Sequence, residues 1–256
     1  MQRRELVRTG LFGAAAAAAG AAHAAQDAAP AKKRLSENWD VVVVGAGFAG
    51  MCAALEAAER GAKTVLLEKM NRPDGATVYS SGWIAAVGSR FQKNHPEDSP
   101  KAFFEDMMRL SHQRSDPELI KVYAEESGAG IDWLADHGTP FYLWEGLPAP
   151  ELSRCLISPG EGITGGSKLI RCLMAALEKK GVAIHYNTKA VSLVKDECFN
   201  VEGVSCITPE GRKDYLARGG VILTTGGYGA NEAMVDKYIG PWASRLIVRG
   251  SPGSTG

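Results

Sequence analysis

Three glycines at a fixed spacing follow directly on a run of four valines. Gly45, Gly47 and Gly50 form a G-x-G-x-x-G pattern after residues 41–44. In such a turn the first glycine permits a tight bend and the second lets the backbone approach a pyrophosphate. The third lets a helix pack closely on a strand. The free N–H groups of the helix that follows would bind the phosphates, so the pattern predicts a dinucleotide site.

An acidic residue stands where such a site needs one. Glu68 lies 68−50 = 18 residues beyond Gly50, at the end of the next apolar stretch. A carboxylate there accepts hydrogen bonds from ribose hydroxyls and repels a 2′-phosphate. Glu68 suits FAD and NAD equally, so both cofactors remain open at this point.

The elements that must position these residues alternate between strand and helix. The unit at the start is a buried strand, a helix stopped by Gly61 and a second strand, at 40–44, 51–60 and 64–67. A Gly/Ser/Pro loop is expected over 72–87 and a longer loop over 145–166, with helices at 100–111, 117–138 and 167–180. Short strands are expected at 183–186, 189–195, 201–207 and 213–217, then a last strand at 220–224.

The composition argues against several classes of protein and of binding site. The 29 basic and 29 acidic side chains give a formal net charge of zero, which argues against nucleic-acid binding. The five cysteines include no C-x-x-C pair, which argues against a disulfide framework, a zinc site and c-type haem attachment. The apolar run at 10–22 is shorter than the roughly 18 residues that cross a bilayer, so no stable membrane insertion is expected.

The N-terminus has the order of an export signal. Arg3 and Arg4 precede the weakly apolar run, and Ala22-His23-Ala24 offers a small-x-small cleavage site. We therefore predict a twin-arginine signal peptide over 1–24, export to the periplasm, and a linker over 25–37. An Ala-rich helix or plain disorder is the alternative for 1–24.

The order of the later elements separates FAD from NAD. An NAD dehydrogenase would continue with alternating strands and helices. This chain instead has a Gly/Ser loop, a helical stretch, a β-meander and a second glycine pair. That order resembles the flavoproteins of the fumarate reductase/succinate dehydrogenase superfamily, including soluble periplasmic fumarate reductases. The residues that carry the resemblance are 41–50, 68–69, 75–86, 98–100, 104–106, 116–117, 131–134, 162–181, 187–188 and 222–230.

The resemblance implies a fold and a set of cofactor contacts. The fold would be an α/β, Rossmann-like FAD-binding domain over 38–256, with a parallel sheet, a β-meander and a helical insertion. The residues implied to hold FAD are Gly45, Ala46, Gly47, Ala49, Gly50, Glu68, Lys69, Ala76, Thr77, Ser81, Gly82, Ala190, Thr225, Gly226 and Gly227. No histidine occurs between 76 and 86, so the FAD is expected to be noncovalent. One departure is that Asp74-Gly75-Ala76 stands where the soluble members carry Gly-Gly-Asn.

The resemblance also implies a reaction. Hydride would pass between flavin and the activated C=C bond of a small unsaturated carboxylate, and a separate carrier such as a cytochrome or a quinol-linked protein would supply electrons. The family's capping domain and hydride-transfer arginine lie beyond residue 256, so no catalytic residue is expected here and the FAD domain is expected to be incomplete. The remaining candidates for a proton donor, Arg72, Tyr79, His137 and Arg154, are poor ones. The alternatives are a noncatalytic truncated fragment and an NAD-linked dehydrogenase.

Overall fold

The computed structural model describes residues 35–93, 98–144, 154–160, 162–246 and 250–256. The expected signal peptide over 1–24 and most of the linker expected over 25–37 lie outside the described residues. The end of that linker was predicted wrongly, because residues 35–37 belong to the first strand, which begins at Leu35. The chain divides into two units, Met1–Leu35 and Ser36–Gly256, and the second unit holds the features below.

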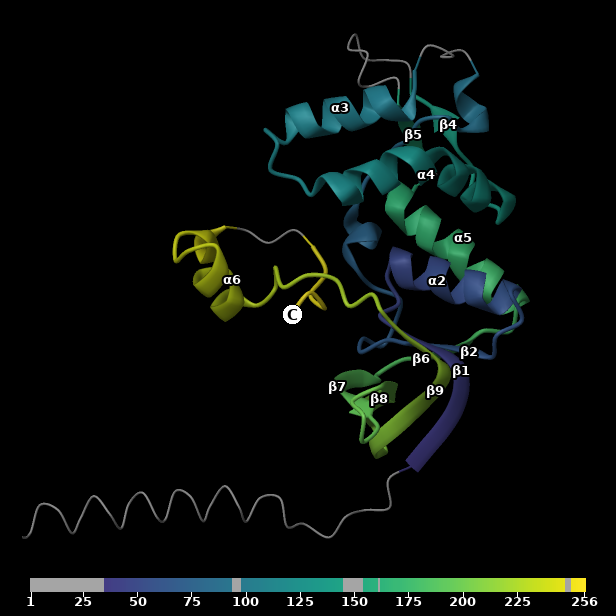
Figure 1. Cartoon of the computed structure of the whole chain (residues 1–256), viewed down its shortest axis with the longest axis vertical. Coiled ribbons are helices and arrows are strands. Elements are labelled where there is room, and N and C mark those ends of the chain that lie inside the picture. The colour runs from purple at the N-terminus through teal and green to yellow at the C-terminus, as the bar shows by residue number, and fades with distance from the viewer. Residues whose placement is uncertain (1–34, 94–97, 145–153, 161, 247–249) are drawn as a thin grey trace, which may run out of the picture. The chain divides into compact units, whose positions relative to one another are not determined.

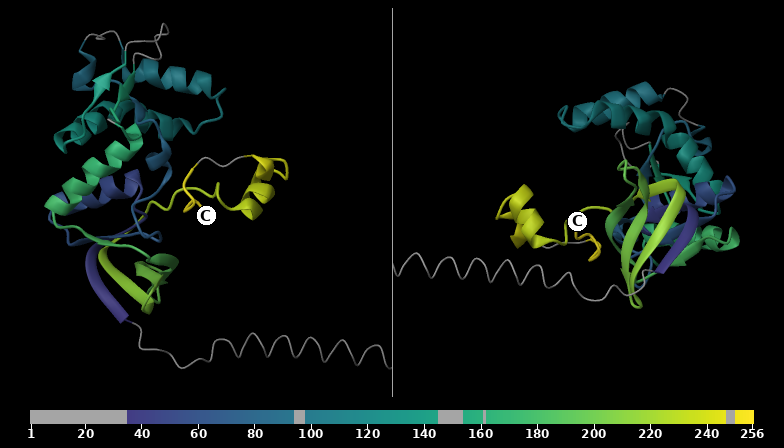
Figure 2. Two further views of the ribbon diagram at one scale, coloured as in Figure 1. Left: turned by 180° about the vertical axis from the view of Figure 1, so that it is seen from behind. Right: turned by 60° about the horizontal axis from the view of Figure 1, so that its bottom comes forward.

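The second unit is built on a six-stranded sheet with the order β6-β2-β1-β9-β8-β7 (Figures 1 and 2). β1, β2 and β6 are parallel, with Val41 beside Thr64 and Val65 beside Ala183. β7, β8 and β9 form the antiparallel meander. The strand bounds are β1 Leu35–Val44, β2 Thr64–Leu67, β6 Ala183–His185, β7 Lys189–Lys195, β8 Val201–Thr208 and β9 Gly211–Leu223.

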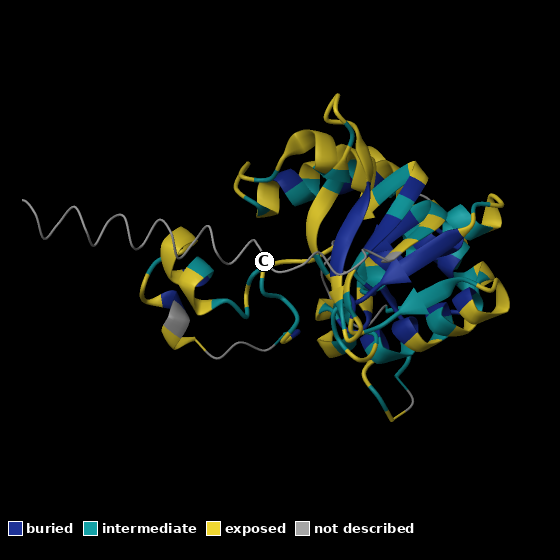
Figure 3. Ribbon diagram, turned by 90° about the horizontal axis from the view of Figure 1, so that it is seen from below, coloured by how far each residue is buried: buried dark blue, intermediate teal, exposed yellow. Residues whose placement is uncertain are grey.

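The valine run is buried on both faces, as an apolar strand at the centre of a sheet must be. Val43 packs with Met51 and Leu173 in the core against helices α2 (Phe48–Glu59) and α5 (Gly165–Lys179). Val42 and Val44 point to the opposite face, where the meander covers them. Figure 3 shows the buried residues gathered on these strands and on the inner faces of the helices. The glycine turn therefore sits on a rigid base.

A helical insertion lies, in chain order, between strands β2 and β6 of the six-stranded sheet. Helices α3 (Pro100–Leu110) and α4 (Pro117–Asp136) are capped by Ser99 and Asp116, each with proline at the first helical position, as the sequence predicts. They accompany a three-stranded antiparallel sheet with the order β3-β5-β4, made of Trp83–Ala85, Cys155–Ile157 and Tyr142–Leu143. Short helices complete the unit: η1 Ala76–Tyr79, η2 Arg90–Gln92, α6 Glu232–Tyr238 and η4 Ala243–Arg245.

Three expected elements differ from the structure. The loop expected over 72–87 contains η1 and β3, and the loop expected over 145–166 contains β5, with residues 145–153 and 161 outside the described part. The two strands expected at 213–217 and 220–224 are one strand, β9. The glycines between them do not break it. A Cβ on Gly219 would lie 2.7 Å from the Asp40 carbonyl oxygen, so glycine is what lets β9 approach β1.

Across the described ranges, no helix is long and apolar enough to cross a bilayer. All five cysteines are free thiols. Burial raises the pKa of Cys52 to about 12, so this thiol is a packing group rather than a nucleophile.

Candidate functional site

A cavity of about 640 Å³ opens where β1, β2 and β9 end. Ligands of open α/β sheets bind at this edge, because the turns there carry free backbone N–H groups. Of the residues implied by the resemblance, those lining the cavity are Gly45, Gly47, Ala49, Glu68, Lys69, Ala76, Thr77, Ala190, Thr225, Gly226 and Gly227. Four others, Ala46, Gly50, Ser81 and Gly82, do not line it.

The three glycines have separate roles. Gly45 has φ +107°, and a Cβ there would lie 2.5 Å from the Thr224 carbonyl oxygen. A Cβ on Gly50 would lie 1.9 Å from the Gly45 carbonyl oxygen, so this glycine lets α2 pack against the turn. Gly47 is different, since its Cβ would meet nothing nearer than the Asp74 carbonyl oxygen at 3.7 Å. Two glycines are therefore needed for packing, and Gly47 leaves space in the cavity.

Helix α2 presents an uncapped N-terminus to the cavity. Its N-cap is Gly47, which has no side chain to accept the first N–H groups, and its first turn contains no acidic residue. Phe48 and Ala49 line the cavity beside it. Uncapped N–H groups and the positive end of the helix dipole form an anion site of the kind that binds a pyrophosphate.

Glu68 is held in place by the backbone on both sides. The side chain is 6% exposed; Oε2 accepts the Ala46 N–H at 2.8 Å and Oε1 accepts the Met70 N–H at 2.8 Å. Each oxygen keeps a second lone pair for a ribose hydroxyl. The sequence argument gave Glu68 only the ribose, whereas the structure adds a role in fixing the glycine turn. The N–H of Ala46, one of the residues implied by the resemblance to hold FAD, is directed at this carboxylate.

The loop after β2 has one stretch that lines the cavity and another that packs against the start of α5. Gly75 has φ +109°, and Ala76 and Thr77 follow it along the cavity wall. Gly82 faces away from the cavity, toward the start of α5, where a Cβ would lie 2.5 Å from the Gly165 carbonyl carbon. Its carbonyl oxygen accepts the Ser158 N–H. Gly82 thus lets the loop approach the start of α5 and hydrogen-bonds it to Ser158 after β5, and Ser81 adjoins it.

Sequence reasoning missed part of the wall. The further lining residues are Val44, Phe48, Asp74, Gly75, Thr188, Lys189, Thr224, Asn231, Ser251, Gly253, Ser254, Thr255 and Gly256. Thr188 was within reach of a sequence argument, because it follows Asn187, a residue type common in turns, and the structure shows a turn backbone there, with Asn187 at φ +52°. The sequence argument did not assign the segment 250–256 to the cavity, because the segment meets the cavity only through the fold.

Two lysines bring positive charge to the wall. Burial lowers the pKa of Lys69, and the neighbouring Lys189 lowers it further, while Glu68 and Asp74 raise it. Lys69 donates to the Thr255 hydroxyl at 2.7 Å. Lys69 and Lys189 are the only basic side chains lining the cavity within the described ranges, and they add to the attraction that the helix N-terminus exerts on an anion.

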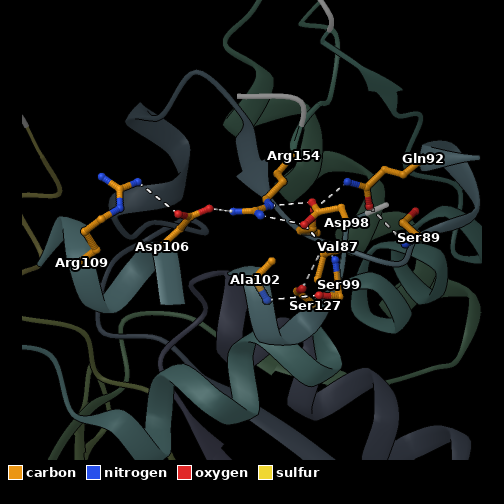
Figure 4. A network of polar contacts seen from close by, with 11 residues as sticks. Val87, Ser89, Gln92, Asp98, Ser99, Ala102, Asp106, Arg109, Ser127 and Arg154 are labelled. Atoms are coloured by element: carbon orange, nitrogen blue, oxygen red, sulfur yellow. Dashed lines mark hydrogen bonds and ion pairs between the residues drawn. The ribbon is translucent and has the colours of Figure 1, made fainter. Parts of the chain in front are cut away.

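Arg154, weighed above as a proton donor, is fully engaged elsewhere (Figure 4). Its Nε and Nη2 donate to the Asp98 carboxylate at 2.6 and 2.7 Å, and Nη1 donates to Asp106 at 2.7 Å. The residue is 5% exposed, and its hydrogen bond lowers the pKa of Asp106. Arg154 ties β5 to the start of α3 and does not line the cavity.

The other proton-donor candidates also lie away from the cavity wall. His137 pairs with Glu59 at 3.1 Å. Arg72 is exposed, and Tyr79 is 44% exposed. Among the remaining histidines, Nδ1 of His185 lies 2.9 Å from the Tyr215 hydroxyl, and His95 lies outside the described residues. None of these side chains is among the described lining residues.

Comparison with known proteins identifies the family. Residues 40–256 match the family described as "FAD binding domain". The chain is 36% identical over 233 residues to a urocanate reductase of Eggerthella lenta, covering 88% of this chain and 38% of that one. It matches the open conformation of a flavocytochrome c3 fumarate reductase with TM-score 0.77 and 31% identity, over 86% of this chain and 39% of that one.

A third match is the 3-ketosteroid-Δ4-(5α)-dehydrogenase of Rhodococcus jostii RHA1, solved in complex with 4-androstene-3,17-dione. Its TM-score is 0.79 at 27% identity, over 89% of this chain and 53% of that one. The chain thus spans between about two fifths and about one half of the length of these three proteins.

Proposed function

The chain belongs to the FAD-binding flavoproteins of the fumarate reductase/succinate dehydrogenase superfamily, and we propose that it forms the FAD-binding part of a reductase acting on unsaturated carboxylates. The observation that carries this proposal is the cavity at the glycine turn, with an uncapped helix N-terminus on one side and the Glu68 carboxylate on the other. The space left at Gly47 fits a pyrophosphate, and the remaining lone pairs of Glu68 fit a ribose.

In this proposal, different wall residues contact different parts of FAD. In the proposal the N-terminus of α2, through Gly47 and Ala49, binds the pyrophosphate, and Glu68 binds the adenosine ribose. Ala190 lies against adenine with its backbone, while Ala76 and Thr77 face the ribityl and flavin end. Residues 225–227 close the wall after β9. When bound, FAD supplies the hydride chemistry, and the protein supplies position and electrostatics.

We propose that FAD is bound without a covalent link. The sequence offers no histidine between residues 76 and 86, the part of the chain nearest the proposed flavin end. The purified protein should show a flavin spectrum, prefer FAD to NAD in a binding titration, and release its flavin to the supernatant on acid precipitation. Flavin retained in the pellet contradicts noncovalent binding, and a chain that binds NAD but no FAD contradicts the proposed cofactor.

The substrate class rests on the relatives. A urocanate reductase and a fumarate reductase both act on unsaturated carboxylates, which supports the same class here. The test is a viologen-linked reduction assay with fumarate, urocanate and acrylate. It is run on this chain and on the urocanate reductase with residues 38–256 substituted for the matching stretch. A chimera that binds FAD and reduces none of the acids contradicts the proposed class.

A second candidate substrate class is a 3-ketosteroid. It is favoured by the structural match with TM-score 0.79, which covers more of this chain than the fumarate reductase match does. Adding 4-androstene-3,17-dione and its reduced counterpart to the same assay separates the two classes. Turnover of a steroid without turnover of any acid would favour this second candidate.

The electron donor and the location are proposed from the sequence. Because the chain has no haem attachment motif, a separate carrier such as a cytochrome or quinol-linked protein would deliver electrons. We propose export by the twin-arginine route, since a protein that folds around a cofactor must cross the membrane folded. Changing Arg3 and Arg4 to lysine should abolish appearance in the periplasmic fraction, and unchanged export would show that the two arginines are incidental.

A further inference from the structure

The segment 250–256 forms one side of the cofactor cavity, opposite the glycine turn. Ser251, Gly253, Ser254, Thr255 and Gly256 all line the cavity together with Gly45 and Gly47. FAD in this cavity would therefore contact both the segment and the turn.

Two side-chain bridges join this segment to the loop after β2. The Ser251 hydroxyl donates to Oδ2 of Asp74 across 177 residues of sequence, at 2.5 Å. Lys69 donates to the Thr255 hydroxyl across 186 residues, at 2.7 Å. Asp74 and Ser251 are 2% and 3% exposed, so the first bridge is shielded from water. A hydrogen bond to a buried charged group is stronger than one at the surface.

The Asp74 carboxylate depends on this bridge. Its other oxygen, Oδ1, is buried and has no hydrogen-bond partner within the described part of the chain. The Ser251 hydroxyl in turn accepts the Gly253 N–H at 3.0 Å, so the bridge also sets the backbone of the segment. Removing the hydroxyl would leave a buried carboxylate unpaired, and water would have to enter between the segment and the loop.

We propose that Asp74 and Lys69, acting through Ser251 and Thr255, hold residues 250–256 as the outer wall of the FAD site and thereby govern the rate at which FAD leaves. The inference rests on the proposed function, because it assigns FAD to the cavity. Asp74 and Lys69 are positioning residues in it. The bridges would act on the dissociation rate, because they fix the position of the wall that contacts the cofactor, and a loosened wall would give up those contacts more often.

The test compares hydroxyl deletions in the FAD-loaded protein. Ser251→Ala and Thr255→Val each remove one bridge, and each should release FAD about ten-fold faster, as followed by the recovery of flavin fluorescence on dilution. The control is Thr208→Val, which removes a hydroxyl-to-carboxylate hydrogen bond of 2.8 Å to Glu210 in the turn between β8 and β9. It should leave the release rate unchanged.

Hydrogen exchange distinguishes a local loosening of residues 250–256 from a general loss of stability. Amides of residues 253–256 should exchange faster in Ser251→Ala than in Thr208→Val, while amides of α2 exchange alike in both. A double-mutant cycle between Asp74→Ala and Ser251→Ala should show that the double variant releases FAD no faster than the faster single variant.

The outcomes are distinguishable. Additive effects in the cycle would mean that Asp74 acts on the cofactor directly and would overturn the inference. Release rates that match the wild type in both hydroxyl deletions, in a protein that binds FAD, would overturn the inference and leave the proposed function standing. A wild-type chain that binds no FAD would overturn both.

Discussion

Replacing Gly47 with alanine should weaken FAD binding without harming the fold. Gly47 has φ −81° and ψ −176°, extended backbone that alanine adopts freely. The added Cβ would lie 3.7 Å from the Asp74 carbonyl oxygen, an ordinary van der Waals distance. Because alanine also restricts the unfolded chain, the stability of the apo-protein should stay the same or rise by about 0.4–1 kcal/mol.

The loss should appear in the affinity for FAD. The Cβ would occupy the space beside the N-terminus of α2, and the phosphates would have to withdraw from its N–H groups. Losing two charge-assisted hydrogen bonds, at about 1.5–3 kcal/mol each, would cost about 3–6 kcal/mol. At 1.4 kcal/mol per decade, this is a weakening of roughly 10²–10⁴ in Kd. Because the phosphates can shift to other donors, we expect the lower end of this range.

Gly50→Ala is the matched comparison, because it adds the same methyl group three residues along. Its Cβ would lie 1.9 Å from the Gly45 carbonyl oxygen and 2.6 Å from Oγ1 of Thr224, so the backbone itself must move. Overpacking of this kind costs about 1–3 kcal/mol, and a clash with the backbone places Gly50→Ala at the upper end. This variant should lose stability even without cofactor.

Urea unfolding of the apo-proteins and a fluorescence titration with FAD separate the two effects. We expect wild-type stability with weak FAD binding for Gly47→Ala, and reduced stability for Gly50→Ala. If Gly47→Ala bound FAD as tightly as the wild type, the pyrophosphate could not lie at this turn. If Gly50→Ala were as stable as the wild type, the packing role assigned to that glycine would be wrong.

Three further predictions concern the groups around the cavity. Glu68→Gln should destabilise the apo-protein by about 1–3 kcal/mol in urea unfolding, because its amide N–H₂ group would face a backbone N–H; an unchanged midpoint would refute this. Arg154→Met should cost about 3 kcal/mol, because it leaves the Asp98 carboxylate without its guanidinium partner and leaves Asp106 with only its pair to Arg109; a cost below about 0.5 kcal/mol would show a surface-type ion pair. Burial lowers the pKa of His137, but its hydrogen bond to a backbone carbonyl and its pairing with Glu59 outweigh that and raise the pKa overall. The stability that His137 contributes is therefore present below its unfolded pKa of 6.5 and lost as pH rises through the folded value. The difference in unfolding free energy from His137→Asn should shrink between about pH 6 and about pH 8, and a constant difference would refute the pairing.

The sequence predicted the parts of the fold that depend on local signals. The valine run and the glycine turn indicated a buried strand and a helix, and both form, with α2 starting at Phe48 inside the motif. The caps Ser99 and Asp116 located α3 and α4 correctly, because a capping side chain and a proline act within one turn of the helix. Such signals need no knowledge of the rest of the chain.

Local signals predicted the wrong strands and loops where contacts with distant parts of the backbone determine the conformation. Gly219 and Gly220 suggested a break between two strands, yet β9 is continuous there, and Gly219 lies so close to β1 that an added Cβ would be 2.7 Å from the Asp40 carbonyl oxygen. The residues around β5 read as a loop because a three-residue strand has no periodicity to detect. The partners of Arg154 lie 48 and 56 residues away, so a sequence argument could weigh its chemistry but not its place.

The cavity also combines a part built from local sequence signals with a part built from contacts between distant segments, and this suggests different functions for its two walls. The glycine turn binds its ligand with backbone groups, so it can be recognised in the sequence from the spacing of its glycines. The wall opposite is joined by side chains from Lys69, Asp74, Ser251 and Thr255, which come from segments nearly 190 residues apart. The glycine turn is part of the packed sheet, whereas residues 250–256 are joined to the loop after β2 by the hydrogen bonds of Ser251 and Thr255. Affinity for the nucleotide half should therefore be sensitive to single methyl groups at the turn, and residence time should be sensitive to single hydroxyl groups at the wall.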